Sequence, residues 1–234
     1  MNMISIIIPT FNEEKYLPKL LKCIKKQTYK NYEIIVADAN SKDKTRQIAK
    51  NYGCKIVKGG LPAIGRNNGA KTAKGNILLF LDADSMIEKW YLKSALKDME
   101  KRRFDVAGSY LYSLSGKFID KFFLGIFNAW IYATQSFYPN ACGSGIFCKK
   151  WLHNKVKGFD ETIKLSEDMD YVRRAGKYGK FRIIKNSRII YSMRRYEKEG
   201  RLKVGLKLFL SALYRIFFGE IKSDVFKYDL RYRK

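Results

Sequence analysis

The chain has 234 residues, of which 46% are hydrophobic, so it can bury a sizeable core and is not expected to be disordered. Lysine and arginine number 47 against 22 aspartates and glutamates, and the formal net charge of +25 predicts an anionic partner: nucleic acid, an acidic membrane surface or a phosphorylated substrate. The single histidine, His153, and four cysteines without CxxC spacing argue against a zinc site or a histidine-based triad.

The first part of the chain alternates short apolar runs with helical patterns. Strands are expected at 4–8, 32–37, 54–57 and 77–81, and helices at 12–24, 41–49 and 66–73. Because such alternation forms parallel sheets with right-handed crossovers, the sequence predicts an α/β fold. The chain runs directly from Met1 into the first strand, so we expect no signal peptide, a cytoplasmic location and reduced cysteines, although Cys142 and Cys148 could bridge.

The second part is less regular. We expect a helix at 90–99, a strand pair or hairpin at 106–114, a turn at 143–145 leading into a strand, a helix from 167 and a strand at 189–191. Residues 118–137 are strongly apolar, but interspersed polar side chains favour a core or interfacial helix over a membrane span. A basic apolar helix is expected at 202–218, before the basic end Arg231–Lys234.

The run Asp82-Ala83-Asp84 directly follows a buried strand. Both carboxylates lie on one side of an extended chain, where they repel each other unless a cation lies beside them. A divalent metal that carries a diphosphate would fit, because hard cations prefer carboxylate and phosphate oxygens. An acidic turn or a helix cap is the alternative interpretation.

Fragments in a fixed order along the chain carry a family resemblance. They are Ile6–Glu13, Ala37–Thr45, Gly65–Ala70, Leu81–Asp84, Gly158–Glu161 and Glu167-Asp168. Over nearly its whole length the chain resembles family 2 glycosyltransferases of the GT-A fold. The resemblance implies a nucleotide-diphosphate sugar donor, a divalent metal (Mn²⁺ or Mg²⁺) and inversion at the anomeric carbon. It also implies a catalytic domain over 1–200, with a donor half (1–90) and an acceptor half (91–200). The residues that follow predict a basic amphipathic extension over 201–234.

The resemblance assigns the donor side to residues near the ends of the early strands. The nucleoside pocket would be lined by Pro9, Thr10, Asn12 and Glu13. Asp38 would accept a hydrogen bond from the nucleobase, but Asp38-Ala39-Asn40 departs from the usual acid-acid-glycine pattern and leaves the base open. Arg66 would reach the nucleotide phosphates, with a structural salt bridge as the alternative. Asp84 would hold the metal, and Asp82 would contact ribose or sugar.

The acceptor side is assigned to later residues. Asp168 would be the general base, with Asp170 as the alternative, although acidic residues are common at the start of any helix. The acceptor or sugar side would include Gly143, Ser144, Gly145 and Glu167. Arg194 and Arg195 would fold over the diphosphate. The chain lacks the Gln-x-x-Arg-Trp signature of processive synthases, which favours transfer of a single sugar.

The helix at 202–218 mixes bulky apolar residues with Lys203, Lys207 and Arg215. Such a helix can lie in an anionic membrane interface, with 118–132 adding to the surface, or it can pack on the domain or on a second copy. We therefore expect a peripheral protein on the cytoplasmic membrane face with a lipid or lipid-linked acceptor.

The charge and the paired carboxylates would also suit two other functions. A basic nucleic-acid-binding protein would fit the charge, but its recognised motifs are absent and the acidic clusters would repel phosphates, so no nucleic-acid partner is expected. A nucleotidyltransferase also uses paired carboxylates, but the first strand is followed by Pro9-Thr10-Phe11-Asn12 and not by a glycine-rich loop.

Overall fold

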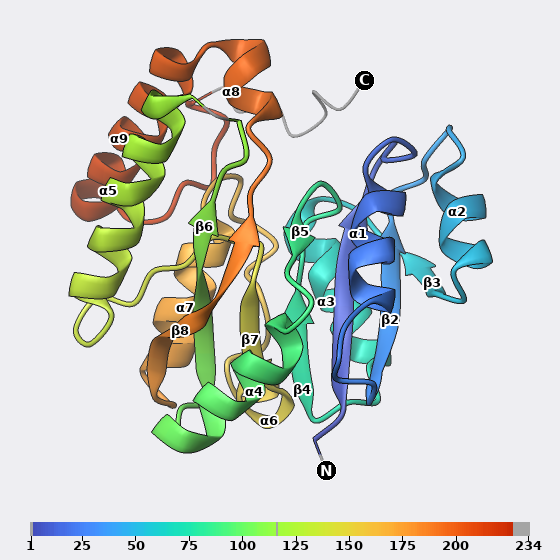
Figure 1. Cartoon of the computed structure of the whole chain (residues 1–234). Helices are drawn as coiled ribbons and strands as arrows, with labels where there is room; N and C mark the ends of the chain where they lie inside the picture. The colour runs from blue at the N-terminus through green and yellow to red at the C-terminus, as the bar shows by residue number, and fades with distance from the viewer. Residues whose placement is uncertain (1, 116, 227–234) are drawn as a thin grey trace.

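The computed structural model describes residues 2–115 and 117–226, in which helices flank one sheet of eight strands (Figure 1). The strands are β1 (Ile4–Thr10), β2 (Tyr32–Asp38), β3 (Lys55–Lys58), β4 (Ile77–Phe80), β5 (Met86–Ile87), β6 (Val106–Tyr112), β7 (Ile146–Lys149) and β8 (Phe181–Ile190). Their order is β3-β2-β1-β4-β7-β6-β8-β5. β1 to β4 are mutually parallel, and so are β6 and β8, whereas β7 and β5 run antiparallel to their neighbours. The expected, mostly parallel α/β sheet is confirmed.

Helices cover both faces of this sheet. They are α1 (Leu17–Lys25), α2 (Thr45–Asn51), α3 (Pro62–Thr72), α4 (Tyr91–Arg102), α5 (Phe118–Thr134), α6 (Lys150–Lys155), α7 (Glu167–Gly176), α8 (Arg194–Glu199) and α9 (Arg201–Phe218). One face packs against α1 and α4, and the other against α3, α6 and α7. The predicted basic end Arg231–Lys234 lies outside the described residues.

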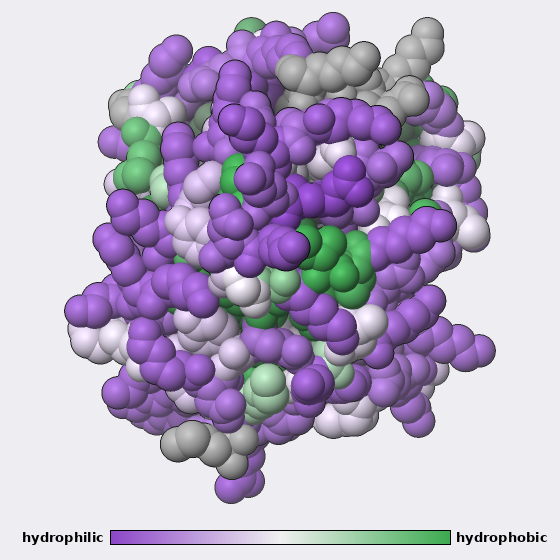
Figure 2. Space-filling model, turned by 90° about the vertical axis from the view of Figure 1, so that its right-hand side faces the viewer, coloured by the Kyte–Doolittle hydropathy of each residue, from purple (hydrophilic) through white to green (hydrophobic). Residues whose placement is uncertain are grey.

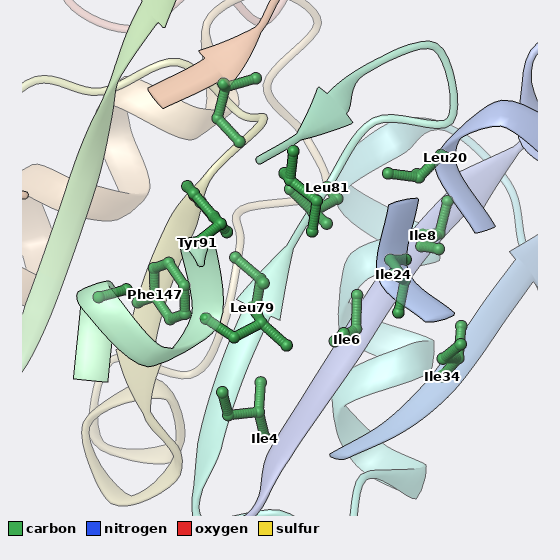
Figure 3. Close-up of a cluster of buried hydrophobic side chains, with 14 of the residues drawn as sticks. Ile4, Ile6, Ile8, Leu20, Ile24, Ile34, Leu79, Leu81, Tyr91 and Phe147 are labelled. Atoms are coloured by element: carbon green, nitrogen blue, oxygen red, sulfur yellow. The ribbon is translucent and has the colours of Figure 1, made fainter. Parts of the chain in front are cut away.

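The apolar strands are continuous runs because both of their faces are buried. In β1, Ile4, Ile6 and Ile8 face the cluster that includes Leu20 and Ile24 of α1, as Figure 3 shows. Ile7, between them, faces the opposite cluster. This period of two is the ordinary consequence of a pleated strand, and two-sided burial is typical of parallel sheets.

Three local expectations were wrong. Residues 106–114 form the single strand β6 and no hairpin, because β6 pairs with β7 on one side and β8 on the other. The helix expected from Asn12 begins only at Leu17, since Asn12 itself has a φ of 54°. The strand expected at 189–191 begins earlier, at Phe181. The short elements β5, α6 and α8 were not predicted.

Large apolar side chains are exposed mainly on two helices. Among the described residues, six lie on α5 and eight on α9, out of 22 exposed in all. The two helices lie at one edge of the molecule in Figure 1, and Arg201 at the start of α9 is ion-paired with Asp120 in the first turn of α5. Figure 2, which shows the side nearest β3 and α2, is by contrast mostly hydrophilic. Within 2–115 and 117–226, no helix is long and apolar enough to cross a bilayer.

Candidate active site

A cavity of about 220 Å³ gathers charged side chains from distant parts of the chain. Asp82 and Asp84 enter it from the segment after β4, and Asp168 from the first turn of α7. Arg66 of α3, Lys164, Glu167 of α7 and Arg195 of α8 are the other charged residues that line it. Asp82, Asp84 and Asp168, to which the sequence assigned separate roles, therefore line one cavity, and those roles stay predictions.

Arg66 is the charged centre of the cavity wall. Its side chain is buried, 3% exposed, and its Nη2 lies 3.0 Å from Asp82 Oδ1 and its Nη1 lies 2.6 Å from Glu167 Oε1. The guanidinium also lies over the Phe159 ring, 5.3 Å from its centroid. A buried arginine between two carboxylates fixes their positions. The predicted contact of Arg66 with donor phosphates stays a prediction.

A glycine is required at position 143 because the guanidinium of Arg66 lies directly against its backbone. A Cβ atom at Gly143 would collide with Arg66 Nη2 and would lie 3.2 Å from Asp168 Oδ2. The close approach that we expected of this glycine is therefore made by the protein's own guanidinium. Ser144 is buried and bonds Ser85, Oγ to Oγ, at 2.6 Å, and Ser144 Oγ accepts from the Asp82 N–H at 3.2 Å. This glycine-serine turn positions the acidic segment after β4.

Asp168 is oriented by two backbone donors. The Gly143 N–H donates to its Oδ2 at 2.5 Å, and the Met169 N–H donates to its Oδ1 at 2.8 Å. Burial, and secondly the neighbouring Glu167 charge, raise the pKa of Asp168 to about 7, against the lowering effect of Arg66. A carboxyl group with a pKa near neutrality is suited to proton transfer.

Asp170, the alternative base, is engaged elsewhere. Its Oδ2 lies 2.7 Å from Arg174 Nη2, one helical turn further along α7. Arg174 in turn donates to the carbonyls of Val156 and Gly158. Asp170 does not line the cavity. The geometry therefore favours Asp168 over Asp170.

Arg194 joins two acidic residues across the site. It forms a bidentate pair with the buried Glu13, at 2.7 and 3.1 Å, and its Nε lies 3.0 Å from Asp84 Oδ2. Its guanidinium also lies over the ring of Tyr16, 4.4 Å from the centroid. A protein cation thus already neutralises the carboxylate predicted to hold a metal. Sequence reasoning missed this arrangement.

The predicted nucleoside-binding residues meet at the carboxyl ends of β1 and β2. Pro9 and Thr10 lie opposite Ala37 and Asp38 in the register of these strands. The Asp38 carboxylate accepts from Thr10 Oγ1 at 3.2 Å and from the Ser41 hydroxyl at 2.5 Å. The Lys42 N–H donates to Asn12 Oδ1 at 2.9 Å. These contacts order the two loops, and the base-binding role of Asp38 stays a prediction.

The far wall of the cavity is apolar and was not predicted. It is formed by side chains from β6, α5, α7, α8, α9 and the adjoining loops, which are Leu111, Phe123, Leu124, Phe127, Leu165, Met169, Met193, Tyr196 and Leu208. The helical period of 118–137 and 202–218 indicated two helices, but it could not show which of their faces would turn to the site.

Asp84 is the residue of the charged wall predicted to hold a divalent metal. No group of three or more histidine, cysteine or acidic side chains that could hold a metal occurs in the described part of the chain. The carboxylate oxygens of Asp84 nevertheless fit a hard cation that takes its remaining ligands from a diphosphate and water. Because Asp84 Oδ2 is paired with Arg194, such a cation would compete with the guanidinium.

Comparison with known proteins supplies the family context. The family described as "Glycosyl transferase family 2" matches residues 5–139. Poly(ribitol-phosphate) beta-N-acetylglucosaminyltransferase TarS of Staphylococcus aureus is 36% identical over 112 residues, which cover 44% of this chain and 20% of TarS. A Methanococcus voltae protein is 28% identical over 215 residues, covering 82% of this chain and 67% of that protein. It is named dolichyl N-acetyl-alpha-D-glucosaminyl phosphate 3-beta-D-2,3-diacetamido-2,3-dideoxy-beta-D-glucuronosyltransferase.

Solved structures agree in fold. S. aureus TarS 1–349 in complex with UDP-GlcNAc superimposes with a TM-score of 0.66 at 22% identity, covering 81% of this chain and 59% of that one. The mannosyltransferase PcManGT from Pyrobaculum calidifontis, in complex with GDP-Man and Mn²⁺, gives 0.66 at 18% identity and covers 82% and 57%. The expected GT-A type of fold is therefore confirmed. The chain spans only about a fifth of the length of TarS, and neither the nucleic-acid-binding nor the nucleotidyltransferase alternative is supported.

Proposed function

The chain belongs to glycosyl transferase family 2, and from this premise we propose that it transfers one sugar from a nucleotide-diphosphate sugar to an acceptor, with inversion. The observation that carries the proposal is the convergence of Asp82, Asp84 and Asp168 on one cavity beyond the carboxyl end of β4. Open α/β sheets bind their ligands at this edge. In the proposal, 1–90 form the donor half and 91–200 the acceptor half.

In this mechanism Asp168 takes the proton from an acceptor hydroxyl. The oxygen then attacks the anomeric carbon from the face opposite the nucleotide diphosphate, which leaves with the electron pair of the broken bond. Arg66 holds Asp82 and Glu167 in position around the sugar. A divalent cation held by Asp84 would supply Lewis-acid stabilisation of the leaving diphosphate. An acceptor that is already ionised, such as a phosphate, would depend less on Asp168.

The direct test is a screen of UDP- and GDP-sugars against the purified chain, with Mn²⁺ or Mg²⁺. Binding of at least one nucleotide sugar, measured by calorimetry, and its stereochemical outcome in transfer, measured by NMR, would support the proposal. An absence of nucleotide-sugar binding across the screen would contradict it.

The activity should depend on pH through Asp168. Since a base must be ionised to accept a proton, kcat/KM for a hydroxyl acceptor is expected to fall about tenfold per pH unit below a pKa of about 7 and to level off above it. The measurement is a pH profile of initial rates at low acceptor concentration. A profile that stays flat down to pH 5 would show that Asp168 is not the base.

Metal binding should be opposed by Arg194. In the Arg194→Gln variant, Mn²⁺ no longer competes with a guanidinium for Asp84, so its dissociation constant is expected to fall about tenfold or more. Electron paramagnetic resonance of free Mn²⁺ measures this without turnover. Arg195→Gln, which removes a positive charge from the same cavity wall, controls for general attraction. An unchanged constant in Arg194→Gln, or undiminished binding in Asp84→Asn, would contradict the assignment.

We further propose that the acceptor is a lipid or lipid-linked molecule and that the chain binds an anionic membrane surface peripherally. The exposed apolar residues of α5 and α9 support this, together with Lys121, Lys203 and Lys207 on the same two helices. Apolar side chains beside lysines suit the interface of an anionic bilayer. The proposed location is the cytoplasmic membrane face.

Vesicle binding tests the membrane contact. The protein is expected to co-sediment with phosphatidylglycerol-containing vesicles at low salt, and less with pure phosphatidylcholine or at high salt. Replacing both Phe217 and Phe218, each 75% exposed, by serine should weaken this partition by about tenfold or more. Equal partition onto neutral and anionic vesicles, or none at low salt, would argue against this surface.

A further inference from the structure

The active-site cavity has two chemically unlike walls. Asp82, Asp84, Asp168 and Arg66 form one, and the other consists of apolar side chains, to which α5 contributes Phe123, Leu124 and Phe127 and α9 contributes Leu208. A sugar nucleotide offers little apolar surface to such a wall. The apolar wall therefore needs an occupant of its own.

The apolar wall continues onto the exposed surface of the same two helices. Phe123 of α5 lines the cavity and is also 38% exposed, and Leu208 of α9 lines it while half-buried. Their sequence neighbours Phe122 and Phe209 do not line the cavity and are 52% and 60% exposed. On each of the two helices, an apolar residue that lines the cavity is thus followed or preceded directly by an exposed apolar residue outside it.

Cations line the same cavity. They are Lys164 and Arg195, which is 7% exposed and lies 3.7 Å from the carboxylate of Glu199. Positive charge beside an apolar wall is complementary to an anionic head group joined to a hydrocarbon chain.

We propose that the apolar part of the cavity, to which α5 and α9 contribute Phe123, Phe127 and Leu208, binds the hydrocarbon chain of an amphiphilic phosphate-bearing acceptor, while its polar head lies toward Asp168. This inference rests on the proposed function, because it takes the cavity to be the acceptor site. The hydrocarbon chain of the acceptor would leave the cavity past Phe123 and Leu208, toward the surface proposed to contact the membrane.

The composition of the wall selects this acceptor class over a polysaccharide. Phenylalanine and leucine side chains make no hydrogen bonds, so a polysaccharide hydroxyl placed against them would lose its water without replacement. A hydrocarbon chain in the same place gains free energy with each buried methylene.

The probes are dimethylallyl, geranyl and farnesyl phosphate, each used below its micellar concentration with the full chain and without donor. Binding is followed by calorimetry and by tryptophan fluorescence, to which Trp90, Trp130 and Trp151 contribute; the Trp130 ring lies 5.9 Å from that of the cavity residue Phe127. Each added isoprene unit is expected to lower the dissociation constant by about tenfold or more. Equal affinity for the three phosphates would overturn the proposal.

Matched variants identify where the hydrocarbon chain of the probe binds. Phe123→Ser and Leu208→Ser should each abolish most of the dependence on chain length, whereas Phe122→Ser and Phe209→Ser should keep it. All four side chains are at least partly exposed, and thermal unfolding of each variant verifies the fold. If Phe122→Ser and Phe209→Ser lost the dependence on hydrocarbon length to the same extent, the hydrocarbon would bind on the outer surface, and the cavity assignment would be overturned.

Nucleotide-sugar binding by the same samples separates the two proposals. If the protein bound a nucleotide sugar but its affinity for the three phosphates did not depend on hydrocarbon length, only the proposed hydrocarbon site would be overturned. Chain-length dependence without binding of any nucleotide sugar would overturn the proposed transfer reaction but leave a lipid-phosphate site in the cavity.

Discussion

Asp168→Asn is expected to lower kcat for transfer to a hydroxyl acceptor by about 10² to 10⁴-fold while donor binding changes little. An asparagine has nearly the shape of the aspartate, but its amide cannot take the acceptor proton. The side chain can keep only one of the two bonds from the Gly143 and Met169 N–H groups, so unfolding is measured alongside. Single-turnover transfer, together with calorimetry of the donor, separates chemistry from binding.

Asp170→Asn is the matched control for this prediction. It changes the same functional group two residues further along α7, where the carboxylate pairs with Arg174 outside the cavity. Transfer by this variant should stay near the native rate, with some loss of stability from the broken pair. If instead Asp168→Asn transferred sugar normally and Asp170→Asn did not, the two roles would have to be exchanged.

The parts of the site that sequence reasoning anticipated are those that follow from strand ends. Asp38 and Asp82 each stand where a buried apolar run stops, and parallel strands bring their carboxyl ends to one edge of the sheet. The helix that starts at Glu167 was expected from its acidic first turn. The spacing of apolar residues, and the acidic residues that end a strand or begin a helix, are local features, so they can be recognised in the sequence alone.

The parts that it could not anticipate depend on how distant elements cross. Arg194 and Glu13 are 181 positions apart, and no local pattern indicates that a guanidinium will lie between Glu13 and Asp84. Likewise, a strand pair or hairpin was expected at 106–114. Only the pairing of β6 with β7 on one side and β8 on the other shows that this segment forms one strand. The inner faces of α5 and α9 became identifiable only once the cavity was known.

Arg66→Met should give the largest loss of stability among the changes considered, about 3–5 kcal/mol near pH 8. The substitution leaves Asp82 and Glu167 without their shared guanidinium, beside the buried Asp168. Urea unfolding followed by circular dichroism measures the change. Arg46→Met is the control: this arginine is 3.7 Å from Asp38 but its side chain is 55% exposed, so we expect a loss below about 1 kcal/mol.

The pH dependence of that loss identifies its cause. Arg66 lowers the pKa of Asp168, which burial and Glu167 raise to about 7, so removing the guanidinium should raise this pKa further. The native variant therefore holds more protons than the native wild type only between a pH of about 7 and the higher pKa of the variant, and in this window its stability falls more steeply as pH rises. The deficit of Arg66→Met should accordingly grow as pH rises above 7 and be smaller at pH 5 than at pH 8. Adding Glu167→Gln, which removes one of the facing charges, should restore part of it at pH 8. A deficit that is equal at both pH values and unaffected by Glu167→Gln would indicate that Arg66 stabilises by packing on Phe159 and not by neutralising the carboxylates.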